Sequence, residues 1–126
     1  MREYLRENSI VNSVAHATYS VNGRLAQWHL EKLILLFDVF EVINGTRSRI
    51  FNDSWYNILQ NLSPDNLAKL KVKYGHEPWN EFSWRKGFTG GSDDHSGLMI
   101  GLTYTIAPEI NMLQELREKK TMAAGK

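Results

Sequence analysis

Two short apolar runs on either side of an amphipathic helix most strongly constrain the fold of this chain. The first run, SIVNSVA at residues 9–15, is rich in β-branched and small residues and stops at His16. Apolar side chains then recur at helical spacing over residues 25–37, and DVFEVI at residues 38–43 follows directly as a second strand-like run. A strand, a helix and a strand joined by short connections are typical of a βαβ unit with parallel strands. We therefore predict an α/β fold.

The middle of the chain contains two further helical segments. We predict one helix at residues 46–60 and another at residues 63–74. The second has clear boundary signals, with Ser63 as the cap residue, Pro64 at the first helical position and Gly75 after the last turn.

The C-terminal third of the sequence has weaker patterns. We expect an ordered loop at residues 76–87, a strand-like stretch at residues 98–105 and a last helix at residues 108–119. No internal repeat, low-complexity segment or linker interrupts the alternation of strands and helices. We expect residues 1–126 to form a single domain.

Composition excludes several classes of site and partner. The chain has no cysteine, so disulfides and thiolate metal ligands are excluded and any metal must be held by His, Asp and Glu. A formal net charge of +1 gives no reason to expect nucleic acid or a membrane surface as partner. The longest apolar run, LILLFDVF, is too short to span a bilayer, and the N-terminus lacks the apolar core of a signal peptide. We expect a cytoplasmic protein.

GFTGGSDDHSGL, at residues 87–98, is the clearest candidate for chemistry. Asp93 and His95 are two residues apart, so in an extended segment their side chains project to the same side, whereas Asp94 points away. A carboxylate oxygen and an imidazole nitrogen placed in this way could converge on a divalent cation. The alternative is a solvated turn, which is the commoner setting of an isolated Asp-x-His pair. Asp94 could orient His95 or serve as a general base, but it is more simply explained as an exposed hydrogen-bonding turn residue.

Two further polar residues belong to the ends of the predicted parallel strands. His16 follows the first strand and Glu41 lies near the end of the second. In βα architectures the carboxyl ends of parallel strands build the functional face, so these side chains are expected near the Asp-x-His motif. The alternatives are a hydrogen-bonded histidine for His16 and an ion pair for Glu41.

Arg85 and Lys86 directly precede the glycine-rich segment. Both present strong donors to anionic oxygens, so they are candidates for binding a substrate phosphate. The alternative is a pair of solvated loop charges.

Four motifs, SVAH, FEVING, GGSDDHSGL followed by GLTYT, and LREKKTMAAGK, resemble in their order the C-terminal half of a PHP domain. PHP (polymerase and histidinol phosphatase) proteins are metal-dependent phosphoesterases. The resemblance implies a partial (β/α)7 TIM-like barrel of the PHP type, with the N-terminal half of the family fold absent. It also implies metal ligation and catalysis by His16, Asp93 and His95, with Glu41 and Asn44 in supporting roles. The implied activity is hydrolysis of a small-molecule phosphoester by metal-activated water, with Zn, Mn or Fe as the divalent metal ion.

Two departures from the family pattern leave alternatives open. No His-x-His motif lies upstream of His16, and Ala17 stands where the family has proline. One alternative is therefore a non-catalytic, truncated PHP remnant or subunit that works only with a partner chain, either a second copy or the missing N-terminal half. Another is a small α/β enzyme that uses the same Asp-x-His motif for unrelated chemistry.

Overall fold

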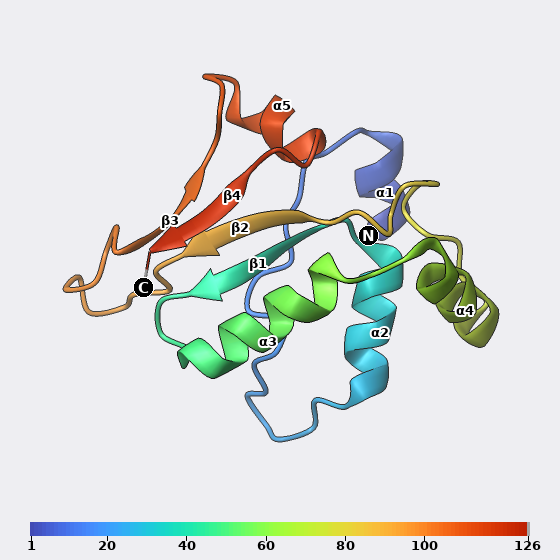
Figure 1. Cartoon of the computed structure of the whole chain (residues 1–126), viewed down its shortest axis with the longest axis horizontal. Coiled ribbons are helices and arrows are strands. Elements are labelled where there is room, and N and C mark those ends of the chain that lie inside the picture. Colours follow the sequence, from blue (N-terminus) through green and yellow to red (C-terminus); the bar gives the residue numbers. More distant parts are fainter. Residues whose placement is uncertain (126) are drawn as a thin grey trace.

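The computed structural model describes residues 1–125, and Figure 1 shows their arrangement. The helices are α1 (Arg2–Glu7), α2 (Gln27–Leu36), α3 (Arg49–Gln60), α4 (Pro64–Tyr74) and α5 (Met112–Arg117). The strands are β1 (Val39–Asn44), β2 (Gly87–Gly91), β3 (Thr103–Ile106) and β4 (Met122–Gly125). Helix α3 packs along β1, and α5 lies beside β2 on the other side of the strands (Figure 1).

Strands β1 and β2 form the parallel centre of the molecule. They pair from Val39 opposite Gly87 to Asn44 opposite Gly91. The predicted first strand at residues 9–15 contributes a single parallel bridge, in which Val14 pairs with β1 through two backbone hydrogen bonds of 2.9 Å. The βαβ unit is therefore present around α2, but its first strand is reduced to that one bridge.

The predicted partial (β/α)7 barrel is wrong. Strands β3 and β4 pair antiparallel, from Thr103 opposite Gly125 to Ile106 opposite Met122, and β1 and β2 are the only parallel strands within residues 1–125. A parallel return requires a helical crossover, whereas the connection from β3 to β4 contains only the six-residue helix α5. The chain therefore turns back beside β3 instead of adding another barrel strand.

The hairpin of β3 and β4 is attached to β2 through a side chain. The hydroxyl of Thr105 accepts from the backbone N–H of Gly90 and donates to its carbonyl oxygen, each at 3.0 Å. A Cβ atom at Gly90 would lie 2.7 Å from the carbonyl oxygen of Tyr104, so only glycine allows this approach.

The helix predictions are confirmed where the sequence contains boundary signals. Helix α4 begins after Ser63, whose hydroxyl accepts from the backbone N–H of Asn66, and ends at Gly75 in the left-handed conformation. The predicted last helix at residues 108–119 is shortened to α5. None of the helices within residues 1–125 has the length and hydrophobicity that crossing a membrane requires.

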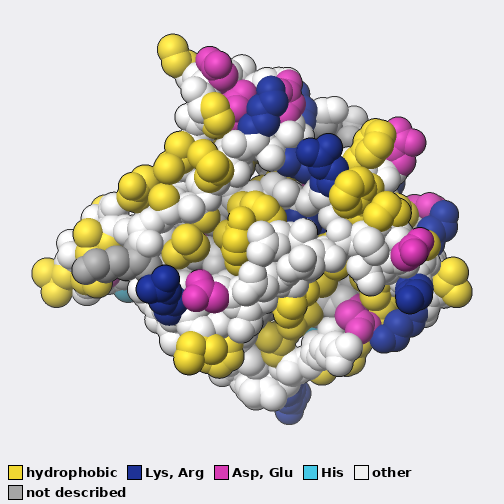
Figure 2. Space-filling view, in the orientation of Figure 1, with side chains coloured by type: hydrophobic (Ala, Val, Ile, Leu, Met, Phe, Trp, Pro, Cys, Tyr) yellow, Lys and Arg dark blue, Asp and Glu magenta, His cyan; other side chains and the backbone are white. Residues whose placement is uncertain are grey.

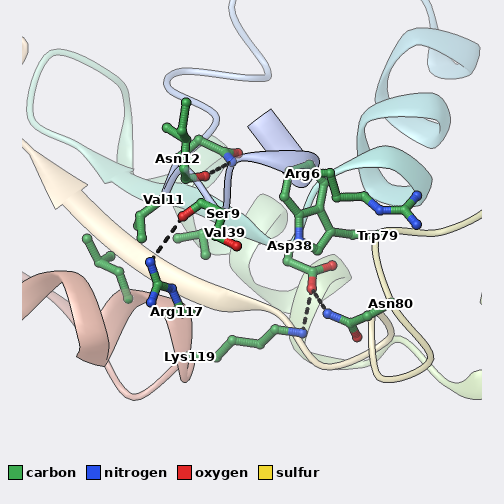
Figure 3. Close-up of a pocket in the computed structure, with 12 residues that line it drawn as sticks. Arg6, Ser9, Val11, Asn12, Asp38, Val39, Trp79, Asn80, Arg117 and Lys119 are labelled. Carbon is green, nitrogen blue, oxygen red and sulfur yellow. Dashed lines mark hydrogen bonds and ion pairs between the residues drawn. The ribbon is translucent and has the colours of Figure 1, made fainter. Parts of the chain in front are cut away.

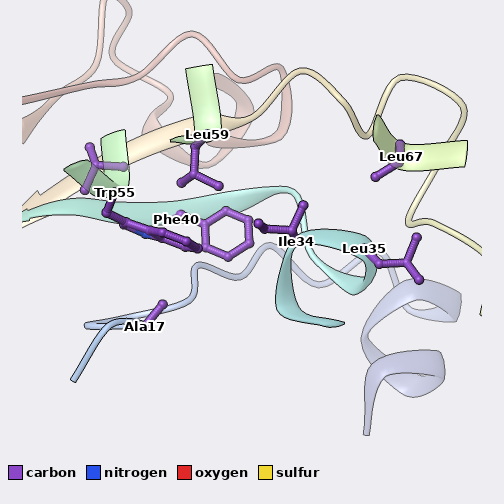
Figure 4. Close-up of a cluster of buried hydrophobic side chains, with 8 residues drawn as sticks. Ala17, Ile34, Leu35, Phe40, Trp55, Leu59 and Leu67 are labelled. Atoms are coloured by element: carbon purple, nitrogen blue, oxygen red, sulfur yellow. The ribbon is translucent and has the colours of Figure 1, made fainter. Parts of the chain in front are cut away.

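The hydrophobic core lies between β1 and the helices α2 and α3. Figure 4 shows its central members, among which Phe40 and Leu35 are fully buried. The ring of Trp55 on α3 packs edge-on against Phe40 at a centroid distance of 5.7 Å. Burying a large apolar side chain contributes about 1.5–3 kcal/mol, so this core fixes β1 and the residues at its carboxyl end.

Candidate functional site

Polar side chains gather where β1 and β2 end. We call Glu41, Asn44, Thr46, Arg47 and Asp93 the strand-end cluster. The amide nitrogen Nδ2 of Asn44 donates to Oε2 of Glu41 and to Oδ2 of Asp93, each at 3.1 Å. One amide group therefore holds two carboxylates next to each other.

The orientation of Asn44 is fixed by its neighbours. Its Oδ1 accepts from the backbone N–H of Thr46 at 3.0 Å and from the Thr46 hydroxyl at 2.8 Å. Its backbone N–H and carbonyl oxygen exchange hydrogen bonds with the side chain of Asn52 on α3, at 3.2 and 3.1 Å. Since a backbone N–H can only donate, Oδ1 must face Thr46 and Nδ2 must face the carboxylates.

Asp93 is held in its ionised form by these contacts. The hydrogen bond from Asn44 is the largest cause that lowers the pKa of Asp93, and burial opposes it in part. A hydrogen bond from Thr46 and the charges of His16 and His95 lower this pKa further. The Asp93 carboxylate is therefore available as an anionic ligand at neutral pH.

Arg47 is a cationic neighbour of the cluster that sequence reasoning missed. Its guanidinium carbon lies 3.6 Å from the centroid of the Tyr19 ring, and Nη2 lies 3.9 Å from Oδ2 of Asp93. Its Nε is buried and has no hydrogen-bond partner within residues 1–125. Its position three residues after the end of a strand could have indicated a site residue. The sequence instead predicts a helix at residues 46–60.

The three predicted metal ligands lie at this end of the sheet but do not converge. The backbone N–H of His16 donates to Oε2 of Glu41 at 2.7 Å, while its ring packs edge-on against Tyr19. The His95 side chain is 91% exposed, and its Nδ1 lies 3.1 Å from the Asp93 carbonyl oxygen and 4.0 Å from Asp93 Oδ1. Within residues 1–125, no three His, Asp or Glu side chains are arranged to hold a metal ion.

The segment that contains Asp93 is not extended, contrary to the sequence prediction. Asp93 has a φ of 48°, and the next residue, Asp94, forms a turn. Oδ1 of Asp94 accepts from the N–H and hydroxyl of Ser96, and Oδ2 accepts from the N–H of Met99 at 2.7 Å. The Ser96 hydroxyl, followed by these backbone donors, lowers the pKa of Asp94 to about 2. The prediction of Asp94 as a hydrogen-bonding turn residue is therefore confirmed.

Arg85 and Lys86 lie at the opposite end of β2, roughly 17 Å along the strand from the cluster at about 3.3 Å per residue. The Lys86 side chain is 0% exposed, and its Nζ donates to the carbonyl oxygens of Ile34 and Phe37 at 2.6 and 2.7 Å. Burial is the main cause that lowers the pKa of Lys86 to about 8. Arg85 is exposed beside Trp84. The structure does not bring either cation to the strand-end cluster.

The donor types at the strand-end cluster fit a divalent cation. Two carboxylates and two imidazoles occur at one end of the sheet, and zinc, manganese and iron accept such oxygen and nitrogen ligands. A Cβ atom at Gly91 would lie 2.7 Å from Oε1 of Glu41, so the glycine leaves room for this carboxylate. His16 and Asp93 also have positive φ values, of 32° and 48°, and such strained residues concentrate at functional sites.

No family model matches the chain, and neither a curated protein nor a solved structure is significantly similar to it. The resemblance to a PHP domain therefore stays a prediction based on the sequence motifs.

Proposed function

We propose that the chain is a metal-dependent hydrolase of small-molecule phosphoesters and that its reaction takes place at the strand-end cluster. Asp93, His16 and His95 would hold the divalent cation, with Glu41 beside them. The observation that carries this proposal is the single amide of Asn44 that holds two carboxylates together next to Arg47. We assign the activity to the cytoplasm because a chain without cysteine suits a reducing compartment.

Electrostatics favours a cation at this point. Two carboxylates that share one donor repel each other, and the single positive charge of Arg47, 3.9 Å from Asp93, can offset only one of them. A divalent cation would offset both negative charges and is often the largest local charge in such a site. The exposed His95 side chain can rotate toward the carboxylates without displacing core residues.

The chain's own residues supply binding and orientation for a phosphoester. A divalent cation at the cluster would polarise a phosphoryl oxygen and make a water molecule more acidic. Arg47, whose side chain is 28% exposed, offers guanidinium donors for a phosphoryl oxygen, and guanidinium groups match the geometry of phosphate. Asn44 keeps Glu41 and Asp93 in fixed positions while the substrate binds.

Hydrolysis of p-nitrophenyl phosphate and of its diester in the presence of Mn²⁺ tests this proposal. We expect turnover that requires Mn²⁺ and that falls by about a hundredfold or more in Asp93→Asn. Asp53→Asn is the matched control, since it removes an exposed carboxylate on α3 whose ion pair within residues 1–125 is with Arg49 alone. Absence of Mn²⁺-dependent turnover in the wild type, or equal turnover in the two variants, would contradict the proposal.

A second candidate function is a non-catalytic subunit that acts with a partner chain. Large apolar side chains are exposed in the C-terminal third of the molecule, and Figure 2 shows hydrophobic side chains over β3, β4 and α5. They include Leu98, Ile100, Tyr104, Ile110, Leu113 and Met122. Extensive apolar surface on a folded chain favours an interaction with another protein. The association state of the chain in solution distinguishes this candidate from the hydrolase.

A further inference from the structure

A polar cavity lies at the end of the parallel strands that is opposite the strand-end cluster. It has a volume of about 190 Å³ and is bordered by the turn after α1, the start of β1, the loop that contains Trp79, and the segment after α5. Figure 3 shows the side chains around it. Three basic residues, Arg6, Arg117 and Lys119, line the cavity together with one acidic residue, Asp38.

The charge of Asp38 is already offset by protein groups. Oδ2 accepts from Nζ of Lys119 and from the amide of Asn80, each at 2.8 Å, and both side chains point to this carboxylate in Figure 3. Nζ of the buried Lys86 lies 3.7 Å from Oδ1. Two ammonium groups therefore face one carboxylate, which leaves an excess of positive charge.

The two arginines at the cavity have little anionic compensation. Arg117 donates from Nη2 to the carbonyl oxygen of Ser9 at 3.0 Å and forms no ion pair with any Asp or Glu within residues 1–125. Among the carboxylates of residues 1–125, Arg6 approaches the exposed one of Glu3, at 3.8 Å, and its guanidinium points away from Arg117 and Lys119 in Figure 3. The Arg117 guanidinium therefore keeps donors for another acceptor in the cavity.

The positive field extends beyond the first cavity. A second cavity, of about 350 Å³, shares Asn80, Arg117 and Lys119 with the first and is also lined by Arg85, Lys86 and one acidic residue, Glu118. The positive charge of Lys119 is one of the causes that lower the pKa of Lys86, after burial. An anion placed beside Arg117 and Lys119 would reduce this repulsion.

We propose that the 190 Å³ cavity binds a small phosphate-bearing ligand, with Arg117 and Lys119 as its cationic contacts. A phosphate dianion matches several cations better than a single carboxylate does, and guanidinium groups bind phosphate through paired hydrogen bonds. Ile10, Val11 and Leu116 supply apolar lining for a short carbon skeleton. This site shares no residue with the strand-end cluster and does not rest on the proposed hydrolase activity.

Titration of the chain with inorganic phosphate, followed by calorimetry and by backbone amide NMR shifts, tests this site. The solution contains chloride at constant ionic strength and EDTA, so that phosphate cannot bind through a cation at the strand-end cluster. We expect saturable binding that perturbs amides near Ser9 and Arg117, and that is weakened about tenfold or more in Arg117→Gln. Arg49→Gln is the matched control because the Arg49 side chain is 92% exposed on α3, and it should bind phosphate like the wild type.

Two further measurements distinguish a specific loss of phosphate binding from a general loss of structure. Arg117→Lys keeps the charge but removes the forked donors, so its affinity for phosphate should lie between those of the wild type and Arg117→Gln. Acetate should bind more weakly than phosphate. Non-saturable phosphate binding, equal affinity in the wild type and Arg117→Gln, or acetate binding as tight as phosphate would overturn the proposal.

Discussion

Asn44 determines the geometry of the strand-end cluster. It is buried at the end of β1, and its side chain bonds Thr46 on one side and the carboxylates of Glu41 and Asp93 on the other. The sequence indicated a role for Asn44 only through a family resemblance, because nothing in an Asn-Gly pair distinguishes a turn residue from a bridging amide. Arg47 was missed for a related reason, since its contacts with Tyr19 and Asp93 join segments far apart in the chain.

Replacement of Asn44 by alanine should destabilise the chain by about 1–3 kcal/mol, because buried partners then lose their hydrogen bonds. The free energy of unfolding in urea measures this loss. Asn57→Ala is the control, since Asn57 is exposed on α3 and, within residues 1–125, bonds only groups of that helix and its C-cap. A loss in Asn44→Ala no greater than that in Asn57→Ala would show that Asn44 is not the organising residue.

Individual elements were predictable where their signals are local. Helix α2, strand β1 and helix α4 carry regular periodicity or capping residues, and all three form. Strand β2 has the sequence GFTGG, which lacks β-branched alternation, and it becomes a strand because β1 and the hydroxyl of Thr105 provide partners. Strand β4 follows the predicted last helix and was not predicted, because it becomes a strand through its pairing with β3.

Lys86 connects α2 to the start of β2. Its Nζ bonds carbonyl oxygens at the carboxyl end of α2 and faces Asp38, so Lys86→Met leaves a buried carboxylate with fewer partners. We expect a loss of about 1–3 kcal/mol in the free energy of unfolding, because the two carbonyl oxygens at the end of α2 lose their donor while Lys119 and Asn80 still pair with Asp38. Arg85→Met, at the exposed neighbouring position, should change stability by about 0.5 kcal/mol or less. Equal effects of the two substitutions would argue against this connection.

Helices α2 and α4 are linked by Glu31, which accepts from Lys73 at 2.6 Å and from the Tyr74 hydroxyl. The hydrogen bond from Lys73, followed by that from Tyr74, lowers the pKa of Glu31 from 4.5 to about 2. The unfolded chain therefore binds this proton more strongly than the folded chain does. The stability that Glu31 contributes is complete above about pH 4.5 and is lost as the pH falls toward 2.

The Glu31→Gln variant should consequently lose less stability than the wild type between pH 6 and pH 3. Urea unfolding at the two pH values measures the difference. Glu7→Gln, which removes an exposed carboxylate on α1, should follow the wild type. Parallel losses in Glu31→Gln and the wild type would contradict the link between α2 and α4.

The two ends of the parallel pair β1 and β2 carry different kinds of polar side chain. Carboxylates and imidazoles occur at its carboxyl end, and lysine and arginine surround the cavity at its amino end. The hairpin of β3 and β4 adds a third feature, the exposed apolar side chains around it. The short β3–β4 connection that prevented the predicted barrel also leaves this apolar surface uncovered within residues 1–125.

Exposed apolar surface of this extent should cause self-association that increases with protein concentration. Sedimentation velocity over a range of concentrations measures it, and Ile110→Lys should shift the equilibrium toward the monomer because Ile110 is fully exposed near α5. Val72→Lys, at an exposed position on α4, is the matched control and should leave association unchanged. A monomer at every concentration would argue against the subunit function.

The most direct test of the strand-end cluster as a cation site is calorimetric titration of Mn²⁺ into the metal-free chain. We predict saturable binding in the wild type, its loss in Asp93→Asn, and unchanged binding in Asp53→Asn, whose carboxylate lies on α3 outside the cluster. No binding in the wild type, or equal binding in all three proteins, would contradict a cation site built from Asp93 and its neighbours.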